Sequence, residues 1–413
     1  MKEKNLCDMP ADEFKNAGYS LIDWAADYLN NIEEYPVLPN IKPGDIKSKL
    51  PEDPPFEGEN FERIINDINE IILPGVTHWQ HPNFMAYFAS TASGPGILAD
   101  IVSSTLNSNG MVWKSSPALT ELEEVVLNWY KKMLNIPDEF KGIIYDTASV
   151  SSLHGIAAAR ENLNLNIRNK GLFDLPKLRL YCSEQAHSSI EKAAVTLGIG
   201  LEGVRKISVD SEFRMIPSEL EAAIKNDLKN GIIPFCVVAT VGTTSTTSVD
   251  PVDEIAEICE KYNLWLHVDA AYAGSAAMLP EMKNYFKGIE KADSIVTNPH
   301  KWLFVPIDLS VFYTRKPEIL KRAFSLVPEY LKTGEDSIVD NLMDYGVQLG
   351  RRFRALKLWF VIRYFGVEGL RERIREHIRL AKLFASWIDE HHNFERLAPV
   401  SFSTVCFRAI KNG

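Results

Sequence analysis

The 413-residue chain has few cysteines, and they are far apart. Its cysteines form no C-x-x-C pair, and their number is odd: Cys7, Cys182, Cys236, Cys259 and Cys406. This spacing provides neither a disulfide framework nor a zinc site of the usual kind. Dispersed cysteines are typical of proteins from a reducing compartment, so the sequence predicts a cytoplasmic location.

Long apolar runs and an excess of basic residues are also missing. The longest apolar stretch, residues 232–242, is too short to span a bilayer, and residues 1–14 lack the apolar core of a signal peptide. The formal net charge is −10, so we expect no nucleic-acid partner. We interpret the densest basic run, "RRFR" at 351–354, as a helix face or an interface ion-pair cluster. Membrane and nucleic-acid functions are therefore not predicted.

The N-terminal part of the chain is predicted to be helical. Residues 11–35 carry an amphipathic stripe, and residues 59–76 form a second helical segment that stops at Pro74-Gly75. The connector between them, residues 36–56, is too rich in proline for a helix. Two helices and an extended arm have little core of their own, so we expect residues 1–85 to pack on another surface, such as a second subunit.

The pattern of residues 86–315 predicts one large α/β domain. Short β-rich runs alternate there with helical segments, as a mostly parallel sheet buried on both faces requires. The predicted strands lie in 142–149, 178–183, 235–242, 264–271 and 293–299, and the predicted helices are 116–135, 150–163, 188–197, 217–230 and 251–262. A third region, 316–413, is predicted to hold helices near 346–365 and 367–390 and the first strands of a second sheet.

Polar residues follow most of the predicted strands. Ligands of open parallel sheets bind beyond the carboxyl ends of the strands, so these residues are expected to share one edge. They are Asp146 to Ser149, His187, Thr243, Thr244, Asp269, Asn298, His300 and Lys301. Each one alone also has a structural interpretation, such as a helix cap, a core histidine, a turn residue or an ion-pair lysine.

Taken together, these residues indicate a carbonyl cofactor. A lysine amine can form a Schiff base with such a cofactor, and a carboxylate at the end of an apolar strand is costly unless it is paired. Asp269 would be paired by a protonated pyridine nitrogen, and a histidine could stack on the ring. The turn at Thr147 and Ser149 could hold a phosphate at a helix N-terminus. Lys301 and Asp269 thus match the two obligatory partners of pyridoxal 5'-phosphate.

Several motifs then resemble one family closely. "HVDAAYAGSA" (267–276) and "NPHKWL" (298–303) resemble the group II pyridoxal-phosphate decarboxylases, specifically the aromatic-L-amino-acid decarboxylases. "EQAHSSIEKA" and "LGRRFRALKLWFVIRYFGVEGL" are similar to the same family, and the likeness runs from about residue 10 to the end. The resemblance implies an aspartate-aminotransferase-like fold of type I, a homodimer with the active site at its interface, a swapped N-terminal arm, and a small C-terminal α/β domain of which only a part is present.

The resemblance also implies roles for single residues. Lys301 corresponds to the Schiff-base lysine, Asp269 to the partner of the pyridine nitrogen, and His187 to the ring-stacking histidine. Phosphate and ring contacts are implied for Ala148, Ser149, Thr244, Ala271, Asn298 and His300. Tyr330, in a polar stretch of the lid type (326–346), corresponds to the tyrosine that reprotonates the substrate carbon.

The family pattern further implies an aromatic substrate pocket. Its expected members are Trp79, Tyr87, Phe88, Ser90, Met111 and Gly350. Aromatic walls favour aromatic side chains, and the glycine would leave room for an indole ring. Four positions differ from the familiar pattern: Asp146 and Gly346 replace a glycine and an arginine, and Asn109 and Met111 stand where isoleucine and phenylalanine are common.

The sequence therefore predicts decarboxylation of tryptophan, phenylalanine, tyrosine or Dopa to an arylalkylamine such as tryptamine or phenylethylamine. Three alternatives remain open. The same scaffold could act as an aromatic aldehyde synthase, although Tyr330 argues against it. The chain could be a truncated, catalytically silent dimer that only binds the cofactor. Lys301 and Asp269 alone would also allow a transaminase, but the sequences around them argue against that chemistry.

Overall fold

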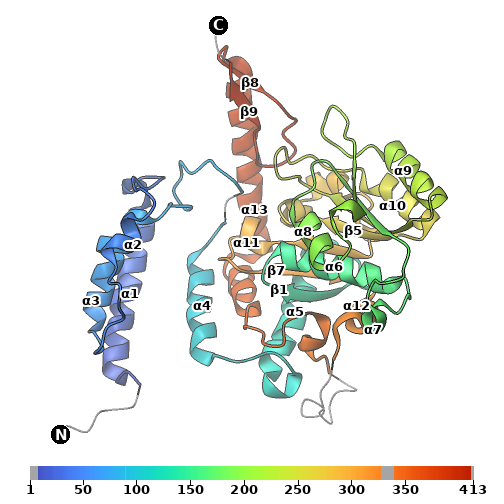
Figure 1. Cartoon of the computed structure of the whole chain (residues 1–413). Coiled ribbons are helices and arrows are strands. Elements are labelled where there is room, and N and C mark those ends of the chain that lie inside the picture. The colour runs from blue at the N-terminus through green and yellow to red at the C-terminus, as the bar shows by residue number, and fades with distance from the viewer. Residues whose placement is uncertain (1–7, 89, 327–338, 411–413) are drawn as a thin grey trace. The chain divides into compact units, whose positions relative to one another are not determined.

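The computed structural model describes residues 8–88, 90–326 and 339–410. The chain divides into two compact units, Met1–Ala89 and Ser90–Gly413 (Figure 1). The first unit is helical and holds no strand within its described residues. The second contains the sheet on which the predicted site is built.

The first unit begins with the predicted amphipathic helix. Helix α1 (Ala11–Asn30) leads into a 3-10 turn, η1 (Ile32–Glu34), and none of its residues is buried. The connector contains one short helix, α2 (Asp45–Lys49), which the proline content did not predict. The second helical segment is α3 (Phe61–Asp67), followed by a π-helical turn, η2 (Ile68–Ile72), and a 3-10 turn, η3 (Leu73–Gly75). It ends at Pro74-Gly75, as expected.

The second unit is built around a seven-stranded sheet. Its strands are β1 (Lys141–Tyr145), β2 (Leu178–Ser183), β3 (Val204–Ile207), β4 (Ile233–Thr240), β5 (Trp265–Asp269), β6 (Ser294–Thr297) and β7 (Ser310–Thr314). Their order across the sheet is β1-β7-β6-β5-β4-β2-β3. All neighbours are parallel except those of β7, which is antiparallel to both β6 and β1. The connection between β6 and β7 contains only the four-residue helix α11 (Pro299–Trp302), and β7 returns antiparallel beside β6.

Helices cover the sheet and account for its long apolar strands. All five residues of β5 are buried, and so are seven of the eight residues of β4. The helices and helical turns are α4 (Gly94–Leu106), η4 (Trp113–Ser115), α5 (Pro117–Met133), α6 (Ala148–Asn162), α7 (Ile167–Lys170), α8 (Ser189–Thr196), η5 (Leu201–Gly203), α9 (Pro217–Lys229), α10 (Val252–Tyr262), η6 (Ala273–Met278), η7 (Pro280–Phe286), η8 (Ile289–Lys291), α11 (Pro299–Trp302), α12 (Pro317–Phe324) and η10 (Leu342–Tyr345). Each predicted helix of the large domain is found within a few residues of its expected ends.

The C-terminal region is dominated by α13 (Ala355–Glu390). Gly366 interrupts this helix with φ 67° and ψ 168°, which separates the two helices that the sequence predicted. The first of them begins at Ala355 rather than near residue 346. Strands β8 (Phe394–Arg396) and β9 (Phe407–Ala409) then form an antiparallel pair, as expected for the start of a second sheet.

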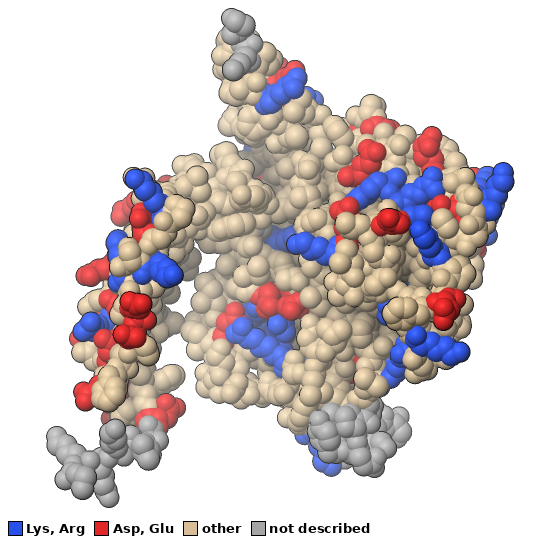
Figure 2. Space-filling view, viewed as in Figure 1, with Lys and Arg blue, Asp and Glu red and all other residues tan. Residues whose placement is uncertain are grey.

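The described surface carries charges of both signs. Lys and Arg side chains are interspersed with Asp and Glu side chains on the face seen in Figure 2. Among the described residues, none of the helices has both the length and the hydrophobicity needed to cross a membrane.

Candidate active site at the carboxyl ends of the strands

Sheet geometry brings the predicted site residues to one edge. Strand β7 is antiparallel to both β1 and β6, so β1 runs in the same direction as β6. The carboxyl ends of β1, β6, β5, β4 and β2 therefore all meet at one edge of the sheet. Each predicted cofactor residue lies at one of these ends or within a few residues beyond it. The arrangement follows from the shared direction of these strands, as the predicted parallel sheet requires.

Asp269 and Lys301 lie at the middle of this edge. Asp269 is the last residue of β5 and is buried, and its Oδ1 accepts a hydrogen bond from the Ala271 N–H at 3.0 Å. Lys301 is partly buried in the short helix α11. Burial lowers the pKa of the Lys301 amine, and the Asp269 carboxylate partly offsets this by raising it. A lysine with a lowered pKa holds more free amine near neutral pH, which is the nucleophilic form.

His187 belongs to the same electrostatic group. It follows β2, remains exposed, and its Nδ1 lies 2.9 Å from Ser189 Oγ and accepts from the Ser189 N–H at 3.1 Å. Desolvation lowers the pKa of His187; Asp269 raises it and Lys301 lowers it again. The charges of Asp269 and Lys301 therefore act on His187, although the three residues follow different strands, β5, β6 and β2.

Asn298 has a buried oxygen that no group in the described chain satisfies. It precedes α11, its backbone N–H donates to the Ala271 carbonyl at 3.0 Å, and only 2% of the residue is exposed. Its side-chain Oδ1 has no hydrogen-bond partner among the described residues. A buried acceptor without a partner costs about 1–3 kcal/mol, so a donor supplied by a bound molecule would stabilise this position.

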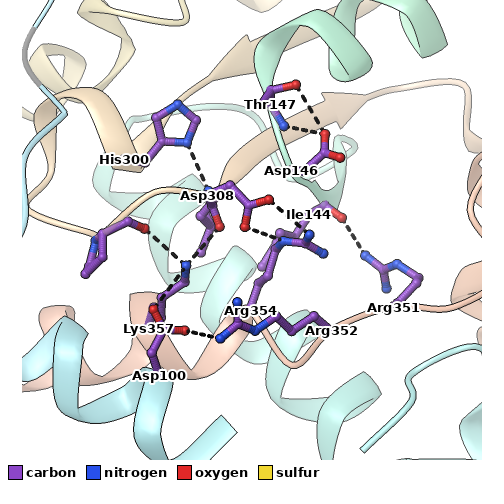
Figure 3. Close-up of polar contacts among 12 residues, drawn as sticks. Asp100, Ile144, Asp146, Thr147, His300, Asp308, Arg351, Arg352, Arg354 and Lys357 are labelled. Atoms are coloured by element: carbon purple, nitrogen blue, oxygen red, sulfur yellow. Dashed lines mark hydrogen bonds and ion pairs between the residues drawn. The ribbon is translucent and has the colours of Figure 1, made fainter. Parts of the chain in front are cut away.

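Ala148 and Ser149 form the first turn of α6, where backbone N–H groups favour an anion. Ser149 is exposed and Ala148 is partly buried. The Asp146 carboxylate accepts from the backbone N–H of Thr147 at 2.6 Å and from its hydroxyl at 3.2 Å (Figure 3). Its charge is therefore partly satisfied by local donors in the turn that leads into α6.

Thr243 and Thr244 lie in the turn after β4, but only one of them is accessible. Thr243 is fully buried, and its Oγ1 accepts from the Ser248 N–H at 3.0 Å. Thr244 is exposed. The structure thus leaves Thr244 available to a ligand and assigns Thr243 a role in the turn.

A buried lysine organises the loop that follows Lys301. His300 is buried, and its Nδ1 accepts from the Leu309 N–H at 2.9 Å. Lys357 Nζ donates to the carbonyls of Pro306 (3.1 Å) and Asp308 (3.0 Å), while Arg354 binds the Asp308 carboxylate through two hydrogen bonds (Figure 3). Burial and the Lys301 charge lower the pKa of His300 to about 4, so the ring is neutral near pH 7.

These loop contacts were not predicted. The sequence predicted that "RRFR" is a helix face or an interface ion-pair cluster, whereas residues 351–353 lie before α13 and the arginines pair within the chain. Arg351 binds Glu123 at 2.8 Å, Arg352 binds Asp100 at 3.0 Å, and Arg354 binds Asp308 at 3.0 Å. The signal that could have found Lys357 is its place in an otherwise apolar helical stretch, "ALKLWF".

The expected substrate residues fall into two groups. In the first unit, Trp79 stacks on Tyr87 with ring centroids 5.7 Å apart, and Phe88 lies beside them in sequence. In the second unit, Gly350 is exposed, and a Cβ added to it would lie 3.7 Å from the Asn109 side-chain amide. Of the other expected substrate residues, Ser90 and Met111 are partly buried. The predicted proton donor, Tyr330, lies outside the described residues.

Gly346, one of the unusual positions, is explained by close packing. A Cβ there would come within 2.7 Å of His154 Nε2 and 3.0 Å of a Tyr145 ring carbon. The neighbouring Val347 N–H donates to His154 Nε2 at 3.0 Å. A larger residue at 346 would therefore require His154 to move.

Comparisons with known proteins identify the family of the chain. Residues 43–410 match the family model described as "Pyridoxal-dependent decarboxylase conserved domain". The chain belongs to that family. It is 44% identical to tyrosine decarboxylase 4 of Petroselinum crispum over 96% of this chain and 80% of the relative. It is 40% identical to a phenylacetaldehyde synthase of a Rosa hybrid cultivar, over 96% and 80% respectively.

A solved structure gives the same fold. Catharanthus roseus tryptophan decarboxylase in complex with L-tryptophan superposes with a TM-score of 0.92 and 38% identity, over 98% of this chain and 86% of that one. The protein is thus an α/β carboxy-lyase of fold type I, and its cofactor is pyridoxal 5'-phosphate. The residues at the edge fit this group: an amine beside a carboxylate, a buried acceptor without a partner at Asn298, and a helix N-terminus.

Proposed function

We propose that this protein converts aromatic L-amino acids into arylalkylamines and CO2, with Lys301 and Asp269 as its central catalytic pair. The observation that carries the proposal is positional: Asp269 ends β5, Lys301 lies in α11 just after the neighbouring strand β6, and both are at the edge where six strands end. Membership of the decarboxylase family supports the reaction, and relatives named for tyrosine and tryptophan support the aromatic substrate.

Lys301 would attach the cofactor covalently, and Asp269 would stabilise the positive charge on its ring nitrogen. Bound pyridoxal phosphate supplies the electron sink that accepts the electron pair left when CO2 departs. Lys301 is suited to covalent attachment because burial favours its neutral amine. The buried Asp269 carboxylate would accept a hydrogen bond from the protonated ring nitrogen, and a charge-assisted hydrogen bond of that kind contributes about 1.5–3 kcal/mol.

The remaining edge residues bind and orient the cofactor. We assign ring stacking to His187, whose charge already interacts with those of Asp269 and Lys301. The phosphate is assigned to the first turn of α6, at Ala148 and Ser149, and to the exposed Thr244. Ala271 and His300 flank the pair: the Ala271 N–H donates to the Asp269 carboxylate, and the His300 ring accepts from the Leu309 N–H.

Tyr330 decides between an amine and an aldehyde product in this proposal. A tyrosine hydroxyl that returns a proton to the substrate carbon gives the amine. The principal alternative, an aromatic aldehyde synthase, has support from the relative named phenylacetaldehyde synthase. The tyrosine at position 330 favours the decarboxylase. A third possibility is a chain that binds the cofactor without turnover, and the product assay described below distinguishes it from the two enzymes.

The substrate is proposed to be tryptophan or a broad range of aromatic amino acids. Gly350 adds no side chain beside Asn109, which leaves space for a large ring. Trp79, Tyr87, Phe88, Ser90 and Met111 are proposed as further walls of the pocket.

We also propose a cytoplasmic homodimer. Helix α1 exposes Phe14, Tyr19 and Ile22 and buries none of its residues, so its apolar side chains are available to a second subunit. The buried free thiols of Cys182, Cys236 and Cys259 are compatible with a reducing compartment.

One assay tests the function. Purified protein is loaded with pyridoxal phosphate and incubated with tryptophan, phenylalanine, tyrosine, Dopa, histidine and glutamate, and the products are identified by mass. Amines from the aromatic substrates are expected. Aldehyde with equimolar peroxide would support the synthase, and covalently held cofactor without product would support the silent dimer. The Tyr330→Phe variant should form amine about 10²–10⁴ times more slowly; unchanged amine output would remove Tyr330 from the proposal.

A further inference from the structure

Four aromatic side chains form a packed group behind the Lys301 turn, and we call them the Trp302 clamp: Tyr272, Trp302, His377 and Phe402. Trp302 follows Lys301 directly, and Tyr272 follows Asp269 by three residues. The two rings stack with centroids 4.9 Å apart and an interplanar angle of 4°. The clamp therefore joins the segment that carries the lysine to the segment that carries the carboxylate.

The clamp is held from the C-terminal part of the chain. The Trp302 indole N–H donates to His377 Nδ1, in α13, at 3.0 Å. Phe402 is fully buried and meets both Tyr272 and Trp302 edge-on, and the Tyr272 hydroxyl is hydrogen-bonded to Ser403 Oγ. Trp302 is only 2% exposed, so its ring has one available position.

The segment after β5 and the segment after β6 also contact each other directly. The Asn298 N–H donates to the Ala271 carbonyl at 3.0 Å, and a Cβ added to Gly274 would lie 2.4 Å from Thr297 Oγ1. Lys301 itself lies in a helix of four residues, which has little stability alone. The buried Trp302 side chain, stacked on Tyr272, therefore helps to fix the orientation of this turn.

We propose that Trp302 and His377 are positioning residues: the indole–imidazole hydrogen bond sets where the Lys301 amine stands relative to the Asp269 carboxylate. The proposal rests on the proposed roles of Lys301 and Asp269. Neither Trp302 nor His377 is proposed to touch the reacting atoms. Trp302 acts through the backbone of α11, and His377 acts through Trp302.

The test removes the hydrogen bond while it keeps the packing. Trp302→Phe retains a ring against Tyr272 without the N–H, and His377→Leu removes the acceptor. His377→Asn restores an acceptor near the place of Nδ1. Trp387→Phe, an exposed tryptophan on the same helix, is the matched control. For each protein we would measure kcat and KM, the pH midpoint of the visible absorbance of the bound cofactor, the fraction of Lys301 that borohydride fixes to it, and the melting temperature.

The expected result separates positioning from plain stability. Trp302→Phe and His377→Leu should lower kcat roughly 2- to 10-fold with little change in KM, as loss of one net hydrogen bond predicts, and should shift the absorbance midpoint. His377→Asn should recover both values, and Trp387→Phe should match the wild type. If the melting temperature falls while the absorbance midpoint and kcat stay unchanged, the positioning role is wrong. If borohydride fails to fix cofactor to Lys301 in the wild type, the proposed function itself fails.

Discussion

His154 gives a quantitative prediction about acid stability. The ring is fully buried in α6 and stacks on Tyr145 with centroids 4.2 Å apart. Its Nδ1 lies 2.6 Å from the Val150 carbonyl and its Nε2 accepts from the Val347 N–H at 3.0 Å, so the proton is on Nδ1 and the ring is neutral. Burial lowers the pKa of His154 from 6.5 to about 4, against smaller raising effects of the Val150 carbonyl and Asp146.

The direction in which stability changes with pH depends on whether the folded or the unfolded chain binds the proton at the higher pH. The unfolded chain takes up a proton at His154 near pH 6.5, whereas the folded chain does so only near pH 4. Stability is therefore present above about pH 6.5 and is lost as the pH falls toward 4. A shift of this size corresponds to about 3 kcal/mol in total, and about 1.8 kcal/mol of it is lost between pH 7 and pH 5.

The assay compares how the free energy of unfolding of cofactor-free protein changes with pH. Urea unfolding is followed by tryptophan fluorescence at pH 7 and pH 5 for the wild type, His154→Gln and His392→Gln, the last being an exposed histidine. His154→Gln should be less stable at both pH values, but its loss between them should be smaller than that of the wild type by about 1.8 kcal/mol. An equal loss in the wild type and His154→Gln would show that His154 does not cause the loss of stability at low pH, and His392→Gln should behave as the wild type.

Three further predictions follow from other contacts. Asp269 raises the pKa of Lys301, so Asp269→Asn should move the labelling of the Lys301 amine in cofactor-free protein to lower pH; a move to higher pH would contradict this. Lys357→Met breaks the buried contacts to the loop and should cost about 3–5 kcal/mol in urea unfolding, whereas the exposed-pair variant Lys225→Met should cost under about 0.5 kcal/mol. A loss of unfolding free energy in Lys357→Met as small as that in Lys225→Met would contradict this prediction. Gly350→Ser should raise the kcat/KM ratio of tyrosine over tryptophan about 10-fold, and an unchanged ratio would remove Gly350 from the pocket.

The helices and strands of the large domain were predictable because their signals are local. Apolar runs such as 178–183 and the helical periodicity of 217–230 depend only on nearby residues, and both segments have the predicted type. The antiparallel direction of β7 was not predictable, because an apolar strand reads the same in either direction. The start of α13 at Ala355 was missed since residues 342–354 are held by Arg351, Arg354 and His154 rather than by helix propensity.

The sequence alone determined the chemical class of the protein: a lysine and an aspartate in recognisable surroundings, on segments expected to end at one edge of a sheet. Only the tertiary structure decided how that pair is supported. Trp302 meets His377 across 75 residues of chain, and Lys357 reaches the carbonyl of Pro306 across 51. Contacts over such separations depend on the packing of α13 against α4, α5 and η6, and no pattern of neighbouring residues encodes them.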